Sequence, residues 1–192
     1  AKLPNKRQSL FFSATMSPKI NSLAKSLLKN PIHVEITPAA TTVERIKQCL
    51  FFVDQHQKPK LLLDLLKEKH LTSILIFTRT KHRANKLSTF LNKNNILSDA
   101  IHGNKSQNAR TKAIKDFKKG KTKVLVATDI AARGIDIDNI SHVINFELPN
   151  EPESYVHRIG RTARAGAKGT AYSFCAADER NFLRDIEKLI RQ

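Results

Sequence analysis

One short stretch of the chain concentrates side chains that bind anions. Residues 155–166 read Tyr-Val-His-Arg-Ile-Gly-Arg-Thr-Ala-Arg-Ala-Gly and hold His157, Arg158, Arg161 and Arg164 within eight positions. The three arginines recur at every third residue, a spacing that brings side chains close to one face of a helix. Converging guanidinium groups suit a multiply charged anion such as a nucleotide phosphate. A solvated basic face is the alternative, so other motifs must decide between the two.

A second cluster combines carboxylates with an arginine. The loop from Asp129 to Asp136 reads Asp-Ile-Ala-Ala-Arg-Gly-Ile-Asp, includes Arg133 and Gly134, and follows an apolar run at 123–127. A carboxylate in such a loop can accept hydrogen bonds from ribose hydroxyls, and its neighbours can hold the arginine. This cluster is a more specific signal than the arginine triplet taken alone.

These clusters need a scaffold, and from Ile46 onward short apolar runs alternate with amphipathic segments. Strands are expected at 47–53, 73–77, 96–101, 123–127, 142–146 and 170–174, and helices at 58–69, 81–92, 106–118, 153–159 and 178–190. The run Ser-Ile-Leu-Ile-Phe at 73–77 is nearly continuous in apolar residues, as in strands covered on both faces. Strands that alternate with crossover helices predict an α/β fold, with a mostly parallel sheet and helices on both faces.

Polar side chains follow three of the expected strands. Thr78, Thr80 and Lys81 follow the strand at 73–77, His102 and Gly103 follow the strand at 96–101, and Thr128 and Asp129 follow the strand at 123–127. In a parallel sheet, ligands bind in the loops at the carboxyl ends of the strands. The three groups are therefore expected together at one edge of the sheet.

Gln107 and Arg110 extend this set from a neighbouring helix. They lie three residues apart in the first turns of a helix that Ser106 opens, so they share a face beside its partly positive end. Backbone amides there favour phosphate, and Arg110 adds a charged fork. Taken alone, however, the two residues would be interpreted as an ordinary exposed pair.

The first part of the chain carries a separate, shorter pattern. An apolar run at 8–12 leads into Ser13 and Thr15, and an amphipathic helical segment follows. A segment without periodicity then predicts a linker at 37–45. The main domain is expected after it, at 46–192.

The composition indicates a polyanionic partner. Lys and Arg total 34 against 17 Asp and Glu in 192 residues, a formal net charge of +17. This surplus favours nucleic acid over a membrane, because no strongly apolar helix, lipidation signal or signal peptide accompanies it. Cys49 and Cys175 lack the spacing of metal or redox sites, so we expect buried, reduced thiols, no metal site and a cytoplasmic protein.

Five motifs in order carry a resemblance to a known family. They are Ser-Ala-Thr at 13–15, Ile-Leu-Ile-Phe-Thr-Arg-Thr-Lys at 74–81, His-Gly at 102–103 with Gln107 and Arg110, Ala-Thr-Asp-Ile-Ala-Ala-Arg-Gly-Ile-Asp at 127–136, and His-Arg-Ile-Gly-Arg-Thr-Ala-Arg at 157–164. This series covers nearly the whole chain and resembles that of DEAD-box RNA helicases. The stretches at 77–82, 102–107 and 145–150 further resemble the bacterial RhlE-type subgroup. Ala163 stands where the commoner motif has glycine, and we expect little consequence because its side chain is small.

The resemblance implies a division of the chain. DEAD-box proteins have two RecA-like domains, and residues 46–192 would form the C-terminal one, with the mostly parallel sheet and helices on both faces. Residues 1–36 would be the last strand and helix of the otherwise missing N-terminal RecA-like domain, and residues 37–45 the interdomain linker. Without the rest of their sheet, that strand and helix would expose an apolar face. Residues 10–28 are therefore expected to self-associate with a neighbouring chain, or to fold back onto the main domain, as an artefact of the missing sheet.

The resemblance also implies a role for each candidate residue. Arg161 and Arg164 would reach the phosphates of ATP as arginine fingers, and His157 would link the nucleotide site to the RNA-coupling region. The nucleotide-binding group comprises Asp136, for the ribose, with Gly134, Arg161 and Arg164. The RNA-binding group comprises Thr80, Gly103, Gln107, Arg110 and Thr128, and the interdomain-coupling group comprises Ser13, Thr15, Asp129 and Arg133.

Two motifs of a complete ATP site do not occur in the sequence. It contains no Gly-x-x-x-x-Gly-Lys-Ser/Thr phosphate loop and no Asp-Glu-Ala-Asp sequence, and Asp178 and Glu179 are interpreted as capping charges of the last helix. Mg²⁺, and with it productive binding of ATP, is therefore expected to depend on the missing N-terminal domain. Hydrolysis of ATP by these 192 residues alone is expected to be negligible.

The preferred function is thus the C-terminal half of an ATP-dependent helicase that unwinds or remodels RNA duplexes, and two others stay open. A DNA helicase or translocase of the same superfamily would differ in which nucleic acid stimulates its turnover. A non-catalytic basic RNA-binding module would explain the charge, but not the grouping of Asp136, Arg161 and Arg164 with glycine-rich turns. Substitution of Arg161 in a complete two-domain protein distinguishes the two hypotheses, an RNA-binding module and a helicase.

Overall fold

The computed structural model describes residues 4, 6–13, 16, 18–34, 46–68, 70–132, 140–163 and 169–191 of the chain. The chain divides into two compact units, Ala1–Thr37 and Pro38–Gln192, which are described separately. The division falls at the start of the predicted linker, and the linker itself lies outside the described residues. The assignment of the first unit to a missing domain stays a prediction.

The smaller unit contains one helix among its described residues, α1, Pro18–Leu27. Proline suits the first turn of a helix, because the N–H that it lacks would have no partner there. Leu23 and Leu27 are 47% and 55% exposed, and Phe12 is 87% exposed. Residues 8–12, expected as a strand, do not form one in the described part of this unit, since a strand requires a neighbour with which to pair.

Six parallel strands form the sheet of the larger unit. They are β1 Ile46–Phe52, β2 Ile74–Phe77, β3 Ser98–Ile101, β4 Val124–Ala127, β5 His142–Asn145 and β6 Gly169–Cys175. Their order is β1-β6-β5-β2-β4-β3, and each neighbouring pair is parallel. All four residues of β2 and of β4 are buried, as their apolar sequences predict.

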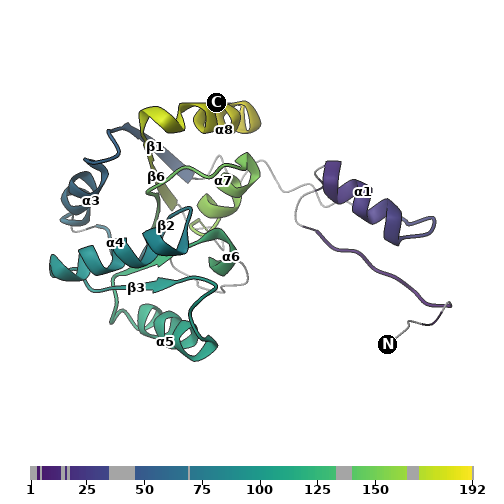
Figure 1. The fold of residues 1–192 in the computed structure, drawn as a ribbon, viewed down its shortest axis with the longest axis horizontal. Helices are drawn as coiled ribbons and strands as arrows, with labels where there is room; N and C mark the ends of the chain where they lie inside the picture. Colours follow the sequence, from purple (N-terminus) through teal and green to yellow (C-terminus); the bar gives the residue numbers. More distant parts are fainter. Residues whose placement is uncertain are drawn as a thin grey trace. The chain divides into compact units, whose positions relative to one another are not determined.

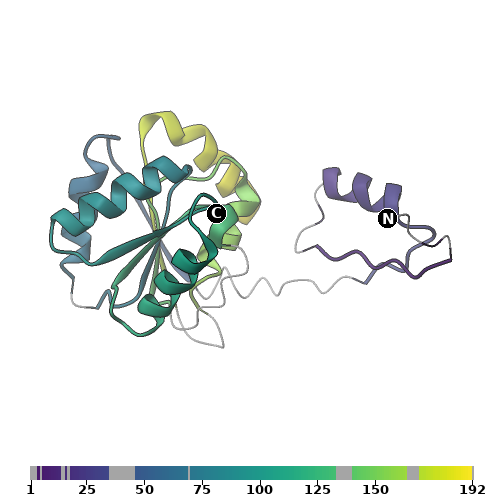
Figure 2. The same ribbon diagram turned by 60° about the horizontal axis from the view of Figure 1, so that its bottom comes forward.

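Helices cover both faces of this sheet (Figures 1 and 2). They are α3 Lys58–Leu66, α4 Lys81–Lys93, α5 Gln107–Lys118, α6 Asp129–Ala132, α7 Pro152–Ile159 and α8 Arg180–Ile190, the last preceded by the 3₁₀ turn η2 Ala177–Glu179. Because side chains alternate along a strand, Ile74 and Ile76 pack with α3 and α4, whereas Leu75 and Phe77 pack with α5. The predicted fold class is therefore confirmed.

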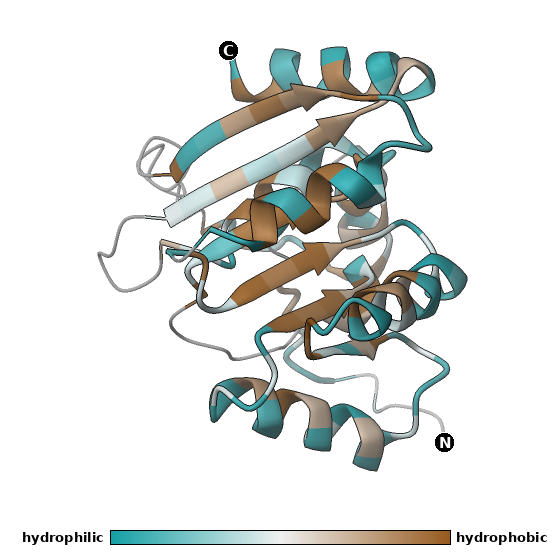
Figure 3. Cartoon of the chain, turned by 90° about the vertical axis from the view of Figure 1, so that its left-hand side faces the viewer, coloured by the Kyte–Doolittle hydropathy of each residue, from teal (hydrophilic) through white to brown (hydrophobic). Residues whose placement is uncertain are grey.

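The apolar residues lie on the strands and on the helix faces turned toward them, with hydrophilic residues outward (Figure 3). A third apolar cluster joins α7 and α8 to β1 and β6 through residues such as Tyr155, Ile159 and Ile186. In the larger unit, the observed elements coincide closely with those expected from sequence, apart from α6, a short helix that the sequence pattern does not predict.

The strand register aligns the carboxyl ends of four neighbouring strands, β2, β3, β4 and β5, along one edge of the sheet. Phe77 at the end of β2 pairs with Ala127 of β4 and with Asn145 of β5, and Ala127 pairs with Ile101 of β3. The polar residues that follow these strands therefore lie along one edge, as the sequence predicts.

Candidate functional site

Arg158 is the buried anchor of the arginine stretch. It lies in α7 and is 1% exposed. Its Nε and Nη2 donate to the two carboxylate oxygens of Asp129 at 2.6 and 2.8 Å, and its Nη1 donates to Asn145 Oδ1 at 3.2 Å and to the main-chain oxygen of Glu147 at 2.7 Å. The guanidinium also lies 5.0 Å from the ring centroid of Phe77. Because its donors are taken up by the protein, Arg158 positions α7 instead of binding a ligand.

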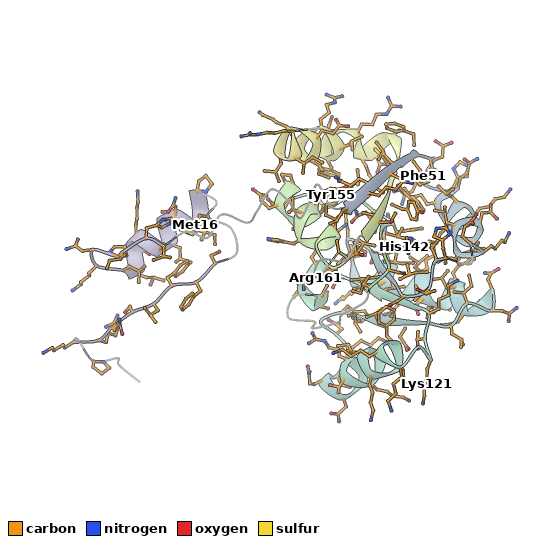
Figure 4. All side chains as sticks on the ribbon, turned by 180° about the vertical axis from the view of Figure 1, so that it is seen from behind. Met16, Phe51, Lys121, His142, Tyr155 and Arg161 are labelled. Atoms are coloured by element: carbon orange, nitrogen blue, oxygen red, sulfur yellow. The ribbon has the colours of Figure 1, made fainter. Side chains whose placement is uncertain are left out.

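His157 and Arg161 line a small cleft between α6 and α7, together with Asp129 and Arg158. Arg161 lies just beyond the end of α7, partly exposed, and its Nε donates to the main-chain oxygen of His157 at 3.3 Å. It is found on the same side of the unit as Tyr155 of α7 (Figure 4). The equal spacing of the arginines thus conceals two environments, since Arg158 is buried and Arg161 borders a cleft.

Three of the nucleotide candidates lie outside the described residues, namely Gly134, Asp136 and Arg164. The coupling candidate Arg133 lies outside them as well. The expected approach of Arg161 and Arg164 to Asp136 therefore stays a prediction. Among the described residues, the nucleotide candidate Arg161 borders the cleft between α6 and α7.

The loop after β2 holds Thr80 at the surface. Thr80 is the N-cap of α4, and its Oγ1 accepts a hydrogen bond from the main-chain N–H of Arg83 at 3.3 Å. Thr78 is buried, and its Oγ1 donates to the main-chain oxygen of Thr80 at 3.3 Å. Hydrogen bonds within the loop therefore fix the position of Thr80 before any ligand arrives.

Arg110 connects α5 to α6. Its Nη1 donates to Gln107 Oε1 at 3.3 Å, so the two residues share a face as predicted, and its Nη2 donates to the main-chain oxygen of Ala131 at 3.3 Å. Arg110 Nε is buried and has no hydrogen-bond partner among the described residues. Ser106 caps α5 as expected, and the main-chain oxygen of Thr128 accepts the first hydrogen bonds of α6. This contact places the candidates on α5 beside Thr128.

His102 supports the loop that contains Gly103. It is 3% exposed, and its Nε2 lies 2.9 Å from Asn85 Oδ1. Burial lowers the pKa of His102, and the positive charges of Lys105 and Lys81 lower it further. Because an amide oxygen only accepts, the neutral ring carries its proton on Nε2. A Cβ on Gly103 would meet no atom within 4 Å, so packing within the described residues does not require glycine there.

The coupling candidates divide between the two units. Asp129 opens α6 and pairs with Arg158 in the larger unit. Ser13 is exposed in the smaller unit, and Thr15 lies outside the described residues. Contact of this region with His157 stays a prediction.

The structure contains a buried network of charges that the sequence does not predict. Glu147 and Glu179, which follow β5 and β6, are both 0% exposed. Glu179 accepts a hydrogen bond from Nζ of the equally buried Lys58 and from the main-chain N–H of Ala176, so it caps η2 as a buried, paired carboxylate. Its side chain makes no capping hydrogen bond to the last helix, α8, for which the sequence predicted a capping charge. Arg79 Nη2 lies 3.5 Å from Glu147 and 3.3 Å from Glu179. The signal that could have found Glu147 is its position two residues after the buried strand β5, whereas Glu179 lies at the end of η2, beyond β6.

The remaining sequence expectations concern metals, membranes and thiols. Over the described ranges, no group of three or more His, Cys, Asp or Glu could hold a metal ion, and no helix is long and apolar enough to cross a membrane. Both cysteines are free. Cys175 is buried as predicted, and burial raises its pKa, but Cys49 is only half-buried because β1 is an edge strand with a neighbour on one side.

Comparisons with known proteins agree with this architecture. Residues 57–166 match the family described as the helicase conserved C-terminal domain. The chain is 46% identical over 188 residues to the ATP-dependent RNA helicase DbpA of Bacillus subtilis (strain 168), covering 98% of this chain and 39% of that protein. It is 41% identical, with a TM-score of 0.69, to E. coli DEAD-box protein SrmB solved with RraA, covering 75% of this chain and 85% of that one.

A third relative aligns over almost the whole chain. S. cerevisiae Dbp5 bound to RNA and ADP BeF3 is 35% identical, with a TM-score of 0.86, covering 98% of this chain and 50% of that one. The chain therefore spans 50% of Dbp5 in that structure and 39% of DbpA.

Proposed function

The chain belongs to the helicase conserved C-terminal domain family, as the C-terminal domain of a DEAD-box RNA helicase, and we propose that it is the half of an ATP-dependent helicase that binds RNA and completes the ATP site. In this role it works with a second RecA-like domain, which holds Mg²⁺ and most of the contacts to ATP. RNA and that second domain are its partners, and the whole protein unwinds or remodels RNA duplexes.

One observation carries the proposal, the bidentate pair of the buried Arg158 with the partly exposed Asp129. The pair joins α7, with Arg161 at its end, to α6, and Arg110 joins α6 to α5. Among the described candidates, Arg161 at the end of α7 and Arg110 on α5 are therefore connected through α6, which supports a shared site at the carboxyl edge of the sheet. A module that only bound RNA would have no need to hold Arg161 beside this edge.

On the ATP side, we assign Arg161 and Arg164 as arginine fingers, Asp136 with Gly134 to the ribose, and His157 to the junction with the other domain. The partly exposed guanidinium of Arg161, at the rim of a cleft, fits a phosphate group. ATP supplies the phosphoryl group whose hydrolysis releases the bound strand. Arginine fingers in other NTPases raise turnover by about 10³- to 10⁵-fold.

On the RNA side, the proposed contacts are Thr80, Gly103, Gln107, Arg110 and Thr128. Within the described part of the chain, the buried Nε of Arg110 has no hydrogen-bond partner, and Ser106 caps the start of α5. Both features support an anion there, because helix N-termini and arginines both bind phosphate. Dbp5, a relative with the same fold, was solved with RNA bound. Contacts to the sugar-phosphate backbone predict affinity that is independent of RNA sequence and weakens with salt.

The test replaces Arg161 with alanine in the full-length protein. We expect RNA-stimulated ATP turnover to fall by about 10³-fold or more, because a charge that stabilises the transferring phosphoryl group is lost. RNA affinity at fixed salt is expected to stay within about threefold, because the proposed RNA contacts do not include Arg161. Arg184→Ala, which removes an exposed arginine of α8, is the matched control and should leave both quantities unchanged.

Two results would favour other functions. If turnover survives Arg161→Ala while RNA binding is lost, the chain is a non-catalytic RNA-binding module. If DNA stimulates turnover of the unaltered protein as strongly as RNA does, the protein is a DNA helicase or translocase.

Several finer proposals accompany this function. We assign the protein to the RhlE-type subgroup and to the cytoplasm, and residues 1–36 to the end of the N-terminal RecA-like domain. We also propose that Ser13, Thr15, Asp129 and Arg133 form the interdomain junction. Measured alone, the 192-residue chain is expected to hydrolyse ATP negligibly and to self-associate through residues 10–28.

A further inference from the structure

Glu147 is a fully buried carboxylate between the two halves of the proposed site. It is the second residue after β5, and the main-chain N–H groups of Phe146 and Glu147 both donate to the main-chain oxygen of Phe77, at 3.1 and 3.4 Å. These bonds fix the residue at the carboxyl ends of β5 and β2. A buried carboxylate is costly unless opposite charges and hydrogen bonds compensate it, so its partners indicate why it is there.

The side chain of Glu147 holds the segment that presents Thr80. Its Oε2 accepts from the main-chain N–H of Arg79 at 3.0 Å, and its Oε1 accepts from Nη1 of Arg83. Nη2 of Arg79 lies 3.5 Å from Oε1. Thr80 lies between these two arginines, and its Oγ1 caps the helix through the N–H of Arg83. Glu179 also approaches Arg79 Nη2, at 3.3 Å, but Glu147 contacts both of the arginines that flank Thr80.

The main-chain carbonyl of Glu147 contacts α7, the helix that contains Arg158. The carbonyl oxygen accepts from Arg158 Nη1 at 2.7 Å, and Arg158 makes its bidentate pair with Asp129. Arg158 is three residues ahead of Arg161, whose Nε bonds back to the main chain of α7. Glu147 is therefore the residue at which the bonds to the Thr80 turn and the bonds to the arginine helix meet.

We propose that Glu147 is a positioning residue that couples RNA binding at Thr80 to the placement of Arg161. This inference rests on the proposed function. When RNA contacts Thr80 or the half-exposed Arg83, the side chain of Glu147 moves with them. The main-chain carbonyl oxygen of Glu147 transmits this movement to Arg158. Connected hydrogen-bond and ion-pair networks of this kind change coupling between sites by about twofold to thirtyfold.

The first test follows the side-chain Nε–Hε NMR signal of Arg158 while the 192-residue chain is titrated with single-stranded oligouridine RNA. We expect the backbone amides of Thr80 and Gly103 to shift, and the Arg158 signal to shift with the same midpoint. In Glu147→Gln, which keeps the shape but places an amide donor against two guanidinium groups, the amide shifts should remain while the Arg158 response is lost.

Two further variants guard against misfolding. Arg83→Met removes a partner that is 46% exposed, so it is milder, and it should also abolish the Arg158 response. Lys86→Met, on an exposed position of the same helix, is the control and should behave as the unaltered chain. If the Arg158 signal follows RNA equally in Glu147→Gln and Arg83→Met, or fails to respond in the unaltered chain although Thr80 and Gly103 shift, the inference is overturned.

The second test measures coupling in the full-length protein as the ratio of the ATP dissociation constants without and with RNA. Coupling is reciprocal and separate from either affinity alone, so a merely structural role would not change this ratio selectively. For Glu147→Gln we expect the ratio to fall by about twofold to thirtyfold, with each ligand's own affinity nearly unchanged. Glu147→Asp, which restores the charge, should recover part of it.

Failure of the proposed function gives a different result. No shift at Thr80 or Gly103 in the unaltered chain would remove the RNA site itself, and this inference with it. An unchanged coupling ratio in Glu147→Gln, with RNA and ATP both bound, would remove the inference alone.

Discussion

Replacing Asp129 with asparagine should destabilise the larger unit while leaving its shape intact. The variant keeps the side-chain volume but removes the charge that faces the guanidinium of Arg158, which is 1% exposed. Removing one partner of a fully buried ion pair costs about 3–5 kcal/mol. Asp129 is 30% exposed, and Arg158 keeps its bonds to Asn145 and Glu147, so we expect a smaller loss. We therefore expect the free energy of unfolding to decrease by about 2–3 kcal/mol.

Urea denaturation of the chain measures this loss. The expected decrease corresponds to a fall of about 4–12 °C in Tm for a domain of this size. Asp185→Asn, at an exposed position of α8, is the matched control and should change the free energy of unfolding by less than about 0.5 kcal/mol. Equal, small effects of Asp129→Asn and Asp185→Asn would refute the reasoning, because they would mean that Arg158 does not depend on its bidentate partner.

Two further predictions concern other buried ionisable residues, Lys58 and His142. Lys58→Met leaves the buried carboxylate of Glu179 without its nearest cation, and we expect the free energy of unfolding, measured by urea denaturation, to fall by about 3 kcal/mol. The double variant Lys58→Met/Glu179→Gln should recover part of this loss, and no recovery would contradict this account. Burial lowers the folded-state pKa of His142, and His70 adds to this, so the unfolded chain binds more protons and stability falls as the pH drops below about 6.5. Denaturation at pH 7.5 and 5.5 should show a shallower pH dependence for His142→Gln, and an unchanged one would exclude His142 as a cause.

Much of the scaffold could be predicted because its causes are local. The apolar run at 73–77 becomes β2, Ile74–Phe77, since a strand buried on both faces needs apolar side chains at every position. Ser106 caps α5 through a hydrogen bond to an N–H three residues away. Such signals act within one turn of helix or one strand, so a single sequence contains them.

The division of labour among the arginines could not be predicted. A spacing of three treats Arg158 and Arg161 alike, but Arg158 pairs with Asp129, 29 positions earlier in the chain. Arg83 likewise reaches Glu147, 64 positions later. Neither pairing leaves a mark in the local pattern, because each depends on which strands are neighbours in the sheet.

The sequence by itself determined the alternation of strands and helices, the edge at which polar residues gather, and the motif series that indicated the family. Only the tertiary structure decided which charged groups are buried as structural partners, such as Arg158, Glu147 and Lys58, and which border a cleft, such as Arg161. The physical reason is that charge pairing follows distance in space. The strand order β1-β6-β5-β2-β4-β3 sets those distances by bringing together loops that are far apart along the chain.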